Sequence, residues 1–167
     1  MNDKLTKSDI EKMEKEIEYR KLELRPKLLE DVKEMRAHGD LSENFEYHAA
    51  KRAKNINESR IRYLDKMIRT AEIIEDNSAD DEIGINNIVT VKFEDDDATE
   101  TYKLVTSVRG DTLNNYITIE SPLGKAILGK KVGERAEVHV NESVSYFVEI
   151  VSFENCKDDS EDEIARF

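Results

Sequence analysis

Apolar residues in the first part of the chain recur at helical spacing. Between Thr6 and about His38 they stand three, four or seven positions apart, which predicts one long helix with a single apolar stripe. Pro26 interrupts this stripe, and because proline lacks an amide hydrogen we expect a kink or a shift of phase there. Thr6 is the expected N-cap, and Gly39 marks the helix end. The stripe consists of Ile10, Met13, Ile17, Leu24, Leu28, Val32 and Met35.

A second helical stripe follows after only a few residues and ends near Ile74. The short connection requires the two helices to pack side by side and antiparallel. A helix of roughly thirty residues is about 45 Å long, at about 1.5 Å per residue. The sequence therefore predicts a long coiled-coil hairpin over residues 1–75. The second stripe consists of Ala49, Ala50, Ala53, Ile56, Ile61, Leu64, Ile68 and Ala71.

The hydrophobic pattern alternates in the second half of the chain, which is typical of β-strands. Residues 88–154 are expected to form a small, mostly antiparallel sheet domain with one short helix that begins near Pro122. Residues 76–87 are acidic and turn-rich, as in a linker, and residues 155–167 are expected to be an acidic, flexible tail. The predicted fold class is α+β: a long antiparallel helical hairpin followed by a small sheet domain.

Charge is distributed unevenly along the chain. Of 26 basic and 38 acidic residues, 17 of each lie in residues 1–75, so the second half holds the entire net charge of −12. Because nucleic-acid affinity depends largely on Lys and Arg, we expect any nucleic-acid contact in the first half. The N-terminus is charged, no apolar run is long enough to cross a membrane, and Cys156 is the single cysteine. These features predict a cytoplasmic protein with no membrane association.

The turn between the helices contains two acids, Asp40 and Glu43, three positions apart. At the start of a helix their carboxylates could converge on one Mg²⁺ ion, which two carboxylates hold weakly unless a partner completes the shell. A capping role competes with this: Asp40 with Glu43 can form a capping box, or Ser42 can be the cap. Spacing alone favours the cap, and both roles can coexist if the carboxylates face outward.

Basic and aromatic side chains surround this turn. Phe45 and Tyr47 could stack on a base or could pack the helix ends together. The basic residues could contact an RNA phosphate backbone, although such residues on a helical hairpin more often form a solvated face. They are Arg36, Lys51, Arg52 and Lys54. The histidines lack zinc-ligand spacing, and the chain has no phosphate-binding glycine motif and no nucleophile elbow.

The segment GDLSENFEYHAAK, from Gly39 to Lys51, resembles the tip signature of the bacterial GreA/GreB transcript cleavage factors. The similarity extends to Arg25-Pro26, to Arg36-Ala37-His38 and to the segment SPLGKAILGKKVG, from Ser121 to Gly133. Members of this family have an N-terminal coiled coil and an FKBP-like C-terminal domain. The few basic residues near the tip resemble the GreA type, and Phe45 stands where the family commonly has alanine.

The resemblance implies that the C-terminal domain binds RNA polymerase while the hairpin enters the polymerase's secondary channel. There Asp40 and Glu43 would help hold a Mg²⁺ ion shared with the polymerase and would stimulate cleavage of the nascent RNA near its backtracked 3′ end. The polymerase owns the active site, so this protein would not be an enzyme by itself. The other implied site residues are Ser42 and Asn44 at the tip, and Glu120, Ser121 and Pro122 at the polymerase contact.

Other functions fit the same sequence pattern. A regulator of the same architecture could occupy the polymerase channel without promoting cleavage. An FKBP-like chaperone or prolyl isomerase, or a structural coiled-coil adaptor, would belong to a different class. The chain has no Trp and five Phe, which argues against an isomerase pocket.

Overall fold

The computed structural model describes residues 2–39 and 43–166. The chain divides into two compact units: a helical unit centred on Ser8–Glu72, and a second unit formed by Lys4–Lys7 and the chain from Ile73 onward. The expected α+β class is confirmed, since a long helical hairpin precedes a small sheet domain with one short α-helix. Two short strands, β1 (Lys4–Leu5) and β2 (Glu72–Ile73), pair with each other.

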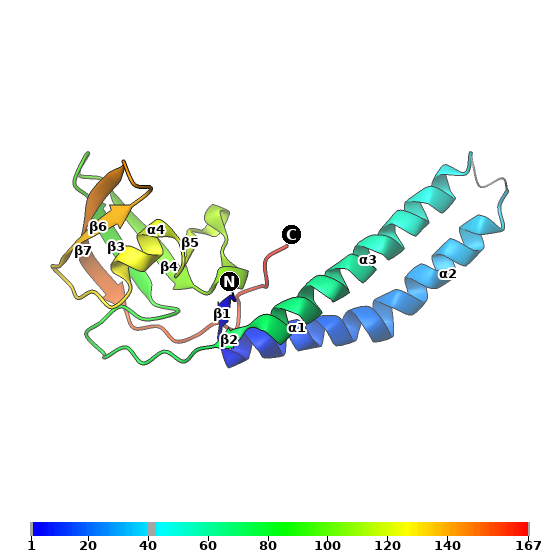
Figure 1. Ribbon diagram of the computed structural model, residues 1–167, viewed down its shortest axis with the longest axis horizontal. Coiled ribbons are helices and arrows are strands. Elements are labelled where there is room, and N and C mark those ends of the chain that lie inside the picture. Colours follow the sequence, from blue (N-terminus) through cyan, green and yellow to red (C-terminus); the bar gives the residue numbers. More distant parts are fainter. Residues whose placement is uncertain (1, 40–42, 167) are drawn as a thin grey trace. The chain divides into compact units, whose positions relative to one another are not determined.

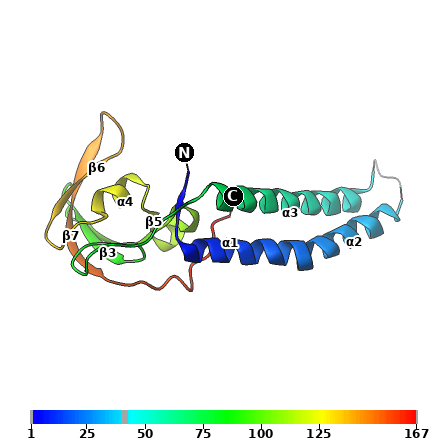
Figure 2. The same ribbon diagram turned by 60° about the horizontal axis from the view of Figure 1, so that its bottom comes forward.

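The hairpin has two antiparallel arms that lie side by side (Figures 1 and 2). The first arm consists of α1 (Lys7–Tyr19), the π-helical turn η1 (Arg20–Leu24) and α2 (Arg25–Arg36). The second arm is the single helix α3 (Phe45–Thr70). The second arm is shorter than expected, because α3 ends at Thr70 and not near Ile74.

The irregularity expected at Pro26 takes the form of the π-helical turn η1. The backbone amide of Arg25 donates to the carbonyl of Arg20, five residues earlier, so this turn contains one residue more than an α-helical turn. Pro26 has no amide hydrogen to continue the regular ladder. The seam, which is the line of residues along which the two arms face each other, shifts accordingly. In the first arm its residues Arg20 and Leu28 are eight positions apart, whereas the corresponding seam residues before and after this turn are seven positions apart.

The seam of α3 differs from the predicted apolar stripe. Ile61, Leu64 and Ile68 lie on it as expected, but Ala49, Ala53 and Ile56 face solvent, and Ile56 is 59% exposed. Polar residues occupy other seam positions, and one of them, Asn57, exchanges two hydrogen bonds with Arg20 of the first arm. The buried and half-buried seam residues of α3 are Tyr47, Ala50, Lys54, Asn57, Ile61, Leu64 and Ile68.

The second unit contains a five-stranded mixed sheet in the order β5-β4-β3-β7-β6. All neighbouring strands are antiparallel except β4 and β5. The strands are β3 (Ile88–Phe93), β4 (Thr99–Val105), β5 (Tyr116–Thr118), β6 (Arg135–His139) and β7 (Ser145–Glu154), and helix α4 spans Pro122–Ile127. Two 3₁₀ turns, η2 (Ser107–Arg109) and η3 (Thr112–Asn114), connect β4 to β5.

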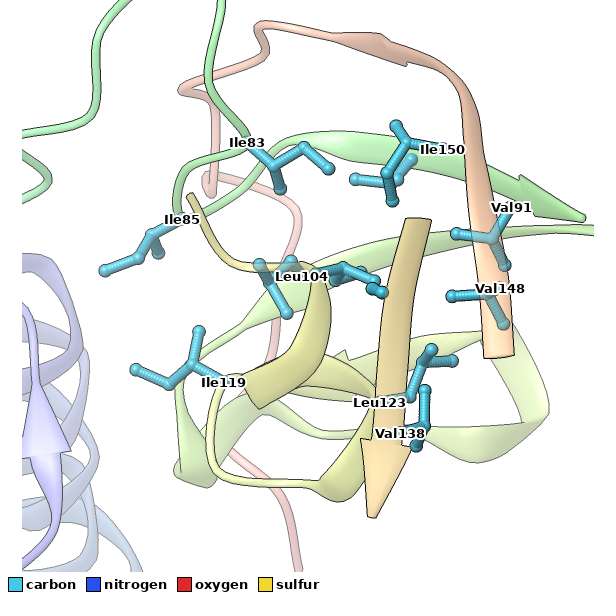
Figure 3. Close-up of a cluster of buried hydrophobic side chains, with 12 residues drawn as sticks. Ile83, Ile85, Val91, Leu104, Ile119, Leu123, Val138, Val148 and Ile150 are labelled. Carbon is cyan, nitrogen blue, oxygen red and sulfur yellow. The ribbon is translucent and has the colours of Figure 1, made fainter. Parts of the chain in front are cut away.

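The core of this unit lies between α4 and the sheet (Figure 3). Leu123 and Ile127 of α4 face apolar side chains from the strands, such as Val138 and Val148. Ile83 and Ile85 belong to the same core, although they lie in the segment expected to be a linker. Residues 83–85 are therefore part of the folded domain, because burying two isoleucines stabilises it by about 3 kcal/mol or more.

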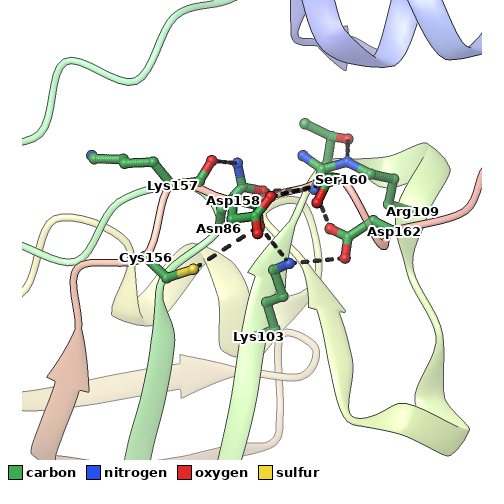
Figure 4. A network of polar contacts seen from close by, with 9 residues as sticks. Asn86, Lys103, Arg109, Cys156, Lys157, Asp158, Ser160 and Asp162 are labelled. Carbon is green, nitrogen blue, oxygen red and sulfur yellow. Dashed lines mark hydrogen bonds and ion pairs between the residues drawn. The ribbon is translucent and has the colours of Figure 1, made fainter.

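The acidic tail after β7 packs against the second unit, contrary to the expectation of a flexible segment (Figure 4). Asp162 is buried and lies 2.7 Å from Arg109 Nη1 and 2.8 Å from Lys103 Nζ. The backbone amide of Ala165 donates to the carbonyl of Val108 at 2.6 Å. Composition favours a flexible segment, but the two ion pairs of Asp162 and the backbone hydrogen bond of Ala165 join the tail to the rest of the unit.

Among the described residues, no helix has the length and apolar character that a bilayer crossing requires.

Candidate functional site at the hairpin tip

Helix α3 is capped by Asn44, which has an extended backbone conformation (φ −88°, ψ 91°). Its side-chain Oδ1 accepts a hydrogen bond from the backbone amide of Tyr47 at 3.0 Å. Asparagine is among the preferred N-caps because its short side chain satisfies an amide that lacks a helical partner. The expectation that Asp40 or Ser42 caps this helix is therefore wrong. Asp40 and Ser42 themselves lie outside the described residues.

Asn44 also contacts the first arm of the hairpin. Its Nδ2 donates to the backbone carbonyl of Met35 in the last turn of α2, at 2.7 Å. One side chain thus accepts a hydrogen bond from a backbone amide at the start of α3 and joins this helix to the end of α2. The sequence placed Asn44 at the tip, but no pattern of residue types indicated this double contact.

Glu43 immediately precedes the cap, and its side chain is exposed. Because α3 begins at Phe45, Glu43 lies outside the first helical turn. The expectation that Asp40 and Glu43 share the first turn of α3, as a capping box or as a metal-binding pair on its surface, is corrected accordingly.

The two aromatic residues at the tip have different environments. Tyr47 is 7% exposed, with its ring 5.4 Å from that of His48 and 5.8 Å from the Arg36 guanidinium. A hydrogen bond with Arg36, together with the nearby charges of Lys51 and Lys54, lowers the pKa of the Tyr47 hydroxyl below its usual value. Phe45 is 85% exposed. Tyr47 therefore joins the helix ends, whereas Phe45 is accessible to a partner.

Three of the four expected RNA-contact residues gather around Tyr47. Arg36 comes from α2, while Lys51 and Lys54 lie one and two turns along α3 on the same side. Arg52 lies about 140° around α3 from Tyr47, at about 100° per residue, so it faces another direction.

The stem of the hairpin is held by ion pairs between its arms. Arg25 forms a bidentate pair with Glu58, with N–O distances of 2.7 and 2.8 Å. The hydrogen bonds from Arg25 hold the pKa of Glu58 below its usual value, and burial opposes this shift only in part. Arg60 of α3 pairs with Glu16 of α1 at 3.0 Å. Such forked arginine–carboxylate contacts fix the register of the two arms.

In the second unit, Ser121 already has a structural role as the N-cap of α4. Its hydroxyl accepts from the amide of Gly124 at 3.1 Å and donates to the carbonyl of Thr118 at 2.7 Å. Glu120 and Pro122 on either side are exposed. A side chain at position 124 would collide with the Thr118 carbonyl, since a Cβ there would lie 1.9 Å from that oxygen.

A cavity of about 720 Å³ adjoins this segment. Its lining includes Ser121, Tyr116 and Leu113, together with Ile164 of the tail. Leu113 is 95% exposed. Ser121, one of the three expected polymerase-contact residues, thus borders a surface that the tail helps to form.

Residues 2–39 and 43–166 contain no group of three or more His, Cys, Asp or Glu side chains arranged to hold a metal ion. Mg²⁺ needs six oxygen ligands and keeps part of its water shell. Glu43 can therefore supply one ligand to such an ion, but other groups must complete the coordination.

Comparisons with known proteins agree over nearly the whole chain. The model described as transcription elongation factor, N-terminal, matches residues 4–73, and the model described as transcription elongation factor, GreA/GreB, C-term, matches residues 77–155. The transcription elongation factor GreA of Streptococcus uberis is 41% identical over 154 residues, covering 92% of this chain and 96% of that protein. The Brucella anthropi factor of the same name is 40% identical over 136 residues, covering 81% and 87%.

A solved structure, that of GreA factor homolog 1 (Gfh1) of Thermus thermophilus, is 23% identical, with a TM-score of 0.43 and coverage of 92% of this chain and 99% of that chain. The family assignment rests on the two matching models and on the sequence relatives. Together they show that this chain belongs to the GreA/GreB family of transcription elongation factors.

Proposed function

We propose that this protein binds bacterial RNA polymerase and stimulates cleavage of the nascent RNA in backtracked elongation complexes. In this proposal the hairpin enters the secondary channel, and the segment with Glu120, Ser121 and Pro122 contributes to docking. The observation that supports it most directly is the exposed carboxylate of Glu43 at the far end of a long, internally braced hairpin. The sequence relatives, which are named transcription elongation factor GreA, support the same proposal.

Glu43 and Asp40 are the proposed acidic groups. A carboxylate of the tip would provide an oxygen ligand next to the polymerase's own acids and would orient the attacking water, or accept its proton. When bound, Mg²⁺ lowers the pKa of that water and stabilises the leaving oxygen. Since Glu43 alone cannot complete the ion's coordination, the cleavage site would form only in the complex, and the free protein would not cleave RNA.

The basic face would guide the RNA. Arg36, Lys51 and Lys54 all lie close to Tyr47. Their positive charges would contact phosphates of the extruded 3′ segment. Arg52 would contribute from another face of α3. These contacts would hold the strand against the carboxylates and would not take part in bond cleavage.

Stalled, backtracked elongation complexes test the proposal. Wild-type protein should increase the release of short 3′ RNA fragments, and the double variant Asp40→Asn, Glu43→Gln should bind the polymerase normally but release few fragments. Glu46→Gln is the matched control, because Glu46 is another exposed carboxylate near the tip. Normal binding of the wild-type protein without cleavage would indicate a non-cleaving regulator. Undiminished cleavage by the double variant would exclude the proposed role of the acids.

A further inference from the structure

We propose that Asn44 is a positioning residue, whose side-chain amide clamps the base of the tip loop and so fixes the place from which the Glu43 carboxylate acts. This inference rests on the proposed function, because it assigns a task to Glu43. It starts from the two hydrogen bonds of Asn44, one to each arm of the hairpin.

The clamp uses both ends of the amide. Oδ1 accepts from the Tyr47 amide at the start of α3, and Nδ2 donates to the Met35 carbonyl at the end of α2. The Met35 carbonyl also accepts from the backbone amide of His38 at 3.2 Å. Since a carbonyl oxygen has two lone pairs, both acceptor sites of Met35 are used. Neither aspartate nor serine can reproduce this pair of contacts, because aspartate has no donor and serine is shorter.

Arg36 also contacts Tyr47 across the two helix ends, and a further side-chain contact there is weaker than the bonds of Asn44. His38 Nδ1 lies 4.0 Å from Glu46 Oε2, and both side chains are more than half exposed. This separation exceeds hydrogen-bond distance, and exposed ion pairs add little to stability. Asn44 is half-buried, so its hydrogen bonds compete less with water than this surface contact does.

The clamp acts on Glu43 through the backbone. Glu43 and Asn44 are neighbours, and consecutive Cα atoms are about 3.8 Å apart. A residue tied to both arms therefore limits how far the Glu43 backbone can move relative to the hairpin. Displacement of a catalytic group by about 1 Å can cost about 100-fold in rate. Losing the clamp should consequently reduce the cleavage step without weakening attachment to the polymerase.

Asn44→Ser is the main test variant, because serine still caps a helix but does not reach the Met35 carbonyl. At saturating factor, we expect the cleavage rate to fall about 10-fold, and the Mg²⁺ concentration for half-maximal cleavage to rise. Polymerase affinity should stay within about two-fold of wild type. Asn55→Ser is the matched control, since Asn55 lies on the exposed face of α3.

Asn44→Asp separates the clamp from the cap. Aspartate keeps the bond from the Tyr47 amide, suits the positive end of the helix, and loses the donor to Met35. Both variants should lose cleavage stimulation. A fully active Asn44→Asp would show that the bond to the Met35 carbonyl is dispensable and would overturn the proposal. Wild-type rate and Mg²⁺ dependence in both variants would also overturn it.

Hydrogen exchange on the free protein tests the clamp independently of RNA cleavage. In Asn44→Asp the backbone amides at positions 43 and 44 should exchange faster than in the wild type, while the backbone amide of Tyr47 stays protected by the cap. Unchanged exchange at Glu43 and Asn44 would contradict the clamp even if the proposed function holds. If Asn44→Asp shows the faster exchange but the wild-type protein does not stimulate cleavage, the clamp is supported and the proposed function is refuted.

Discussion

Arg109 Nη1 lies 2.7 Å from Asp162 Oδ2, and both side chains are completely shielded from solvent. The same nitrogen donates to Asn86 Oδ1 at 2.6 Å, and Lys103 Nζ lies 2.8 Å from the other oxygen of Asp162. The tail carboxylate therefore joins strand β4 to the turn η2, and Arg109 connects both to the segment before β3. The tail is an integral part of the second unit, because removing its carboxylate would leave a buried guanidinium without this counter-charge.

Asp162→Asn should destabilise the protein by about 3 kcal/mol, since removing one partner of a buried ion pair leaves the other charge uncompensated. Urea unfolding followed by circular dichroism measures this change. Glu161→Gln, at the exposed neighbouring position, is the control and should change the free energy of unfolding by less than about 0.5 kcal/mol. Equal effects of the two substitutions would show that the tail is not part of the folded unit.

Asp76 should make stability depend on pH in acid. Burial would raise the pKa of its carboxyl, but hydrogen bonds from Lys157 and Ser78 outweigh burial and hold the pKa below its usual value. Because the pKa is lower in the folded state, the stabilisation is complete above the unfolded value of about 3.9 and is lost as the pH falls through the folded pKa.

Asp76→Asn should therefore lower the free energy of unfolding by about 1 kcal/mol at pH 7, and the difference from wild type should shrink below about pH 4. Urea unfolding between pH 3 and 7 checks both parts. Asp95→Asn, in an exposed turn, should show neither effect. A difference that stays constant over this range would mean that the Asp76 charge does not stabilise the fold.

The sequence pattern predicted the helical hairpin, the short helix at Pro122 and the irregularity near Pro26. These features depend on local signals: apolar spacing, a proline at a helix start, and a missing amide hydrogen. The seam of α3 could not be predicted in the same way. An apolar pattern selects Ala53 and Ile56, whereas Lys54 and Asn57 are the residues that lie on the seam. The hydrogen bond between Asn57 and Arg20 crosses the hairpin, and residue spacing along one helix does not reveal it.

Local sequence patterns also fail to predict the N-cap at the tip and the packing of the tail. Asp40, Ser42 and Asn44 are all good N-caps by residue type, and only the position of the helix start identifies Asn44. In the tail, composition indicated a flexible segment. The partners that bury Asp162 lie 53 and 59 residues earlier in the chain, so no local pattern reveals them.

The two aromatic residues of the tip should respond differently to truncation. Tyr47→Ala should destabilise the hairpin by about 2 kcal/mol or more, because it removes a buried ring and the contact with Arg36. Phe45→Ala should change stability by less than about 0.5 kcal/mol, because that ring is 85% exposed. Thermal unfolding followed by helical circular dichroism distinguishes them. A large loss of stability in Phe45→Ala would mean that its ring packs against the hairpin.

Asn57 should stabilise the hairpin at the π-helical turn of the first arm. Its Nδ2 donates to the Arg20 carbonyl at 3.3 Å, and its Oδ1 accepts from Arg20 Nη1 at 2.9 Å. Asn57→Ala removes both contacts and leaves polar groups of Arg20 without this partner, so urea unfolding should show a loss of about 2 kcal/mol. Asn55→Ala, on the exposed face of the same helix, is the matched control and should be neutral or slightly stabilising, because alanine is the better helix former. If both alanine variants unfold alike, the wide turn is stable without Asn57, and the missing amide of Pro26 alone accounts for it.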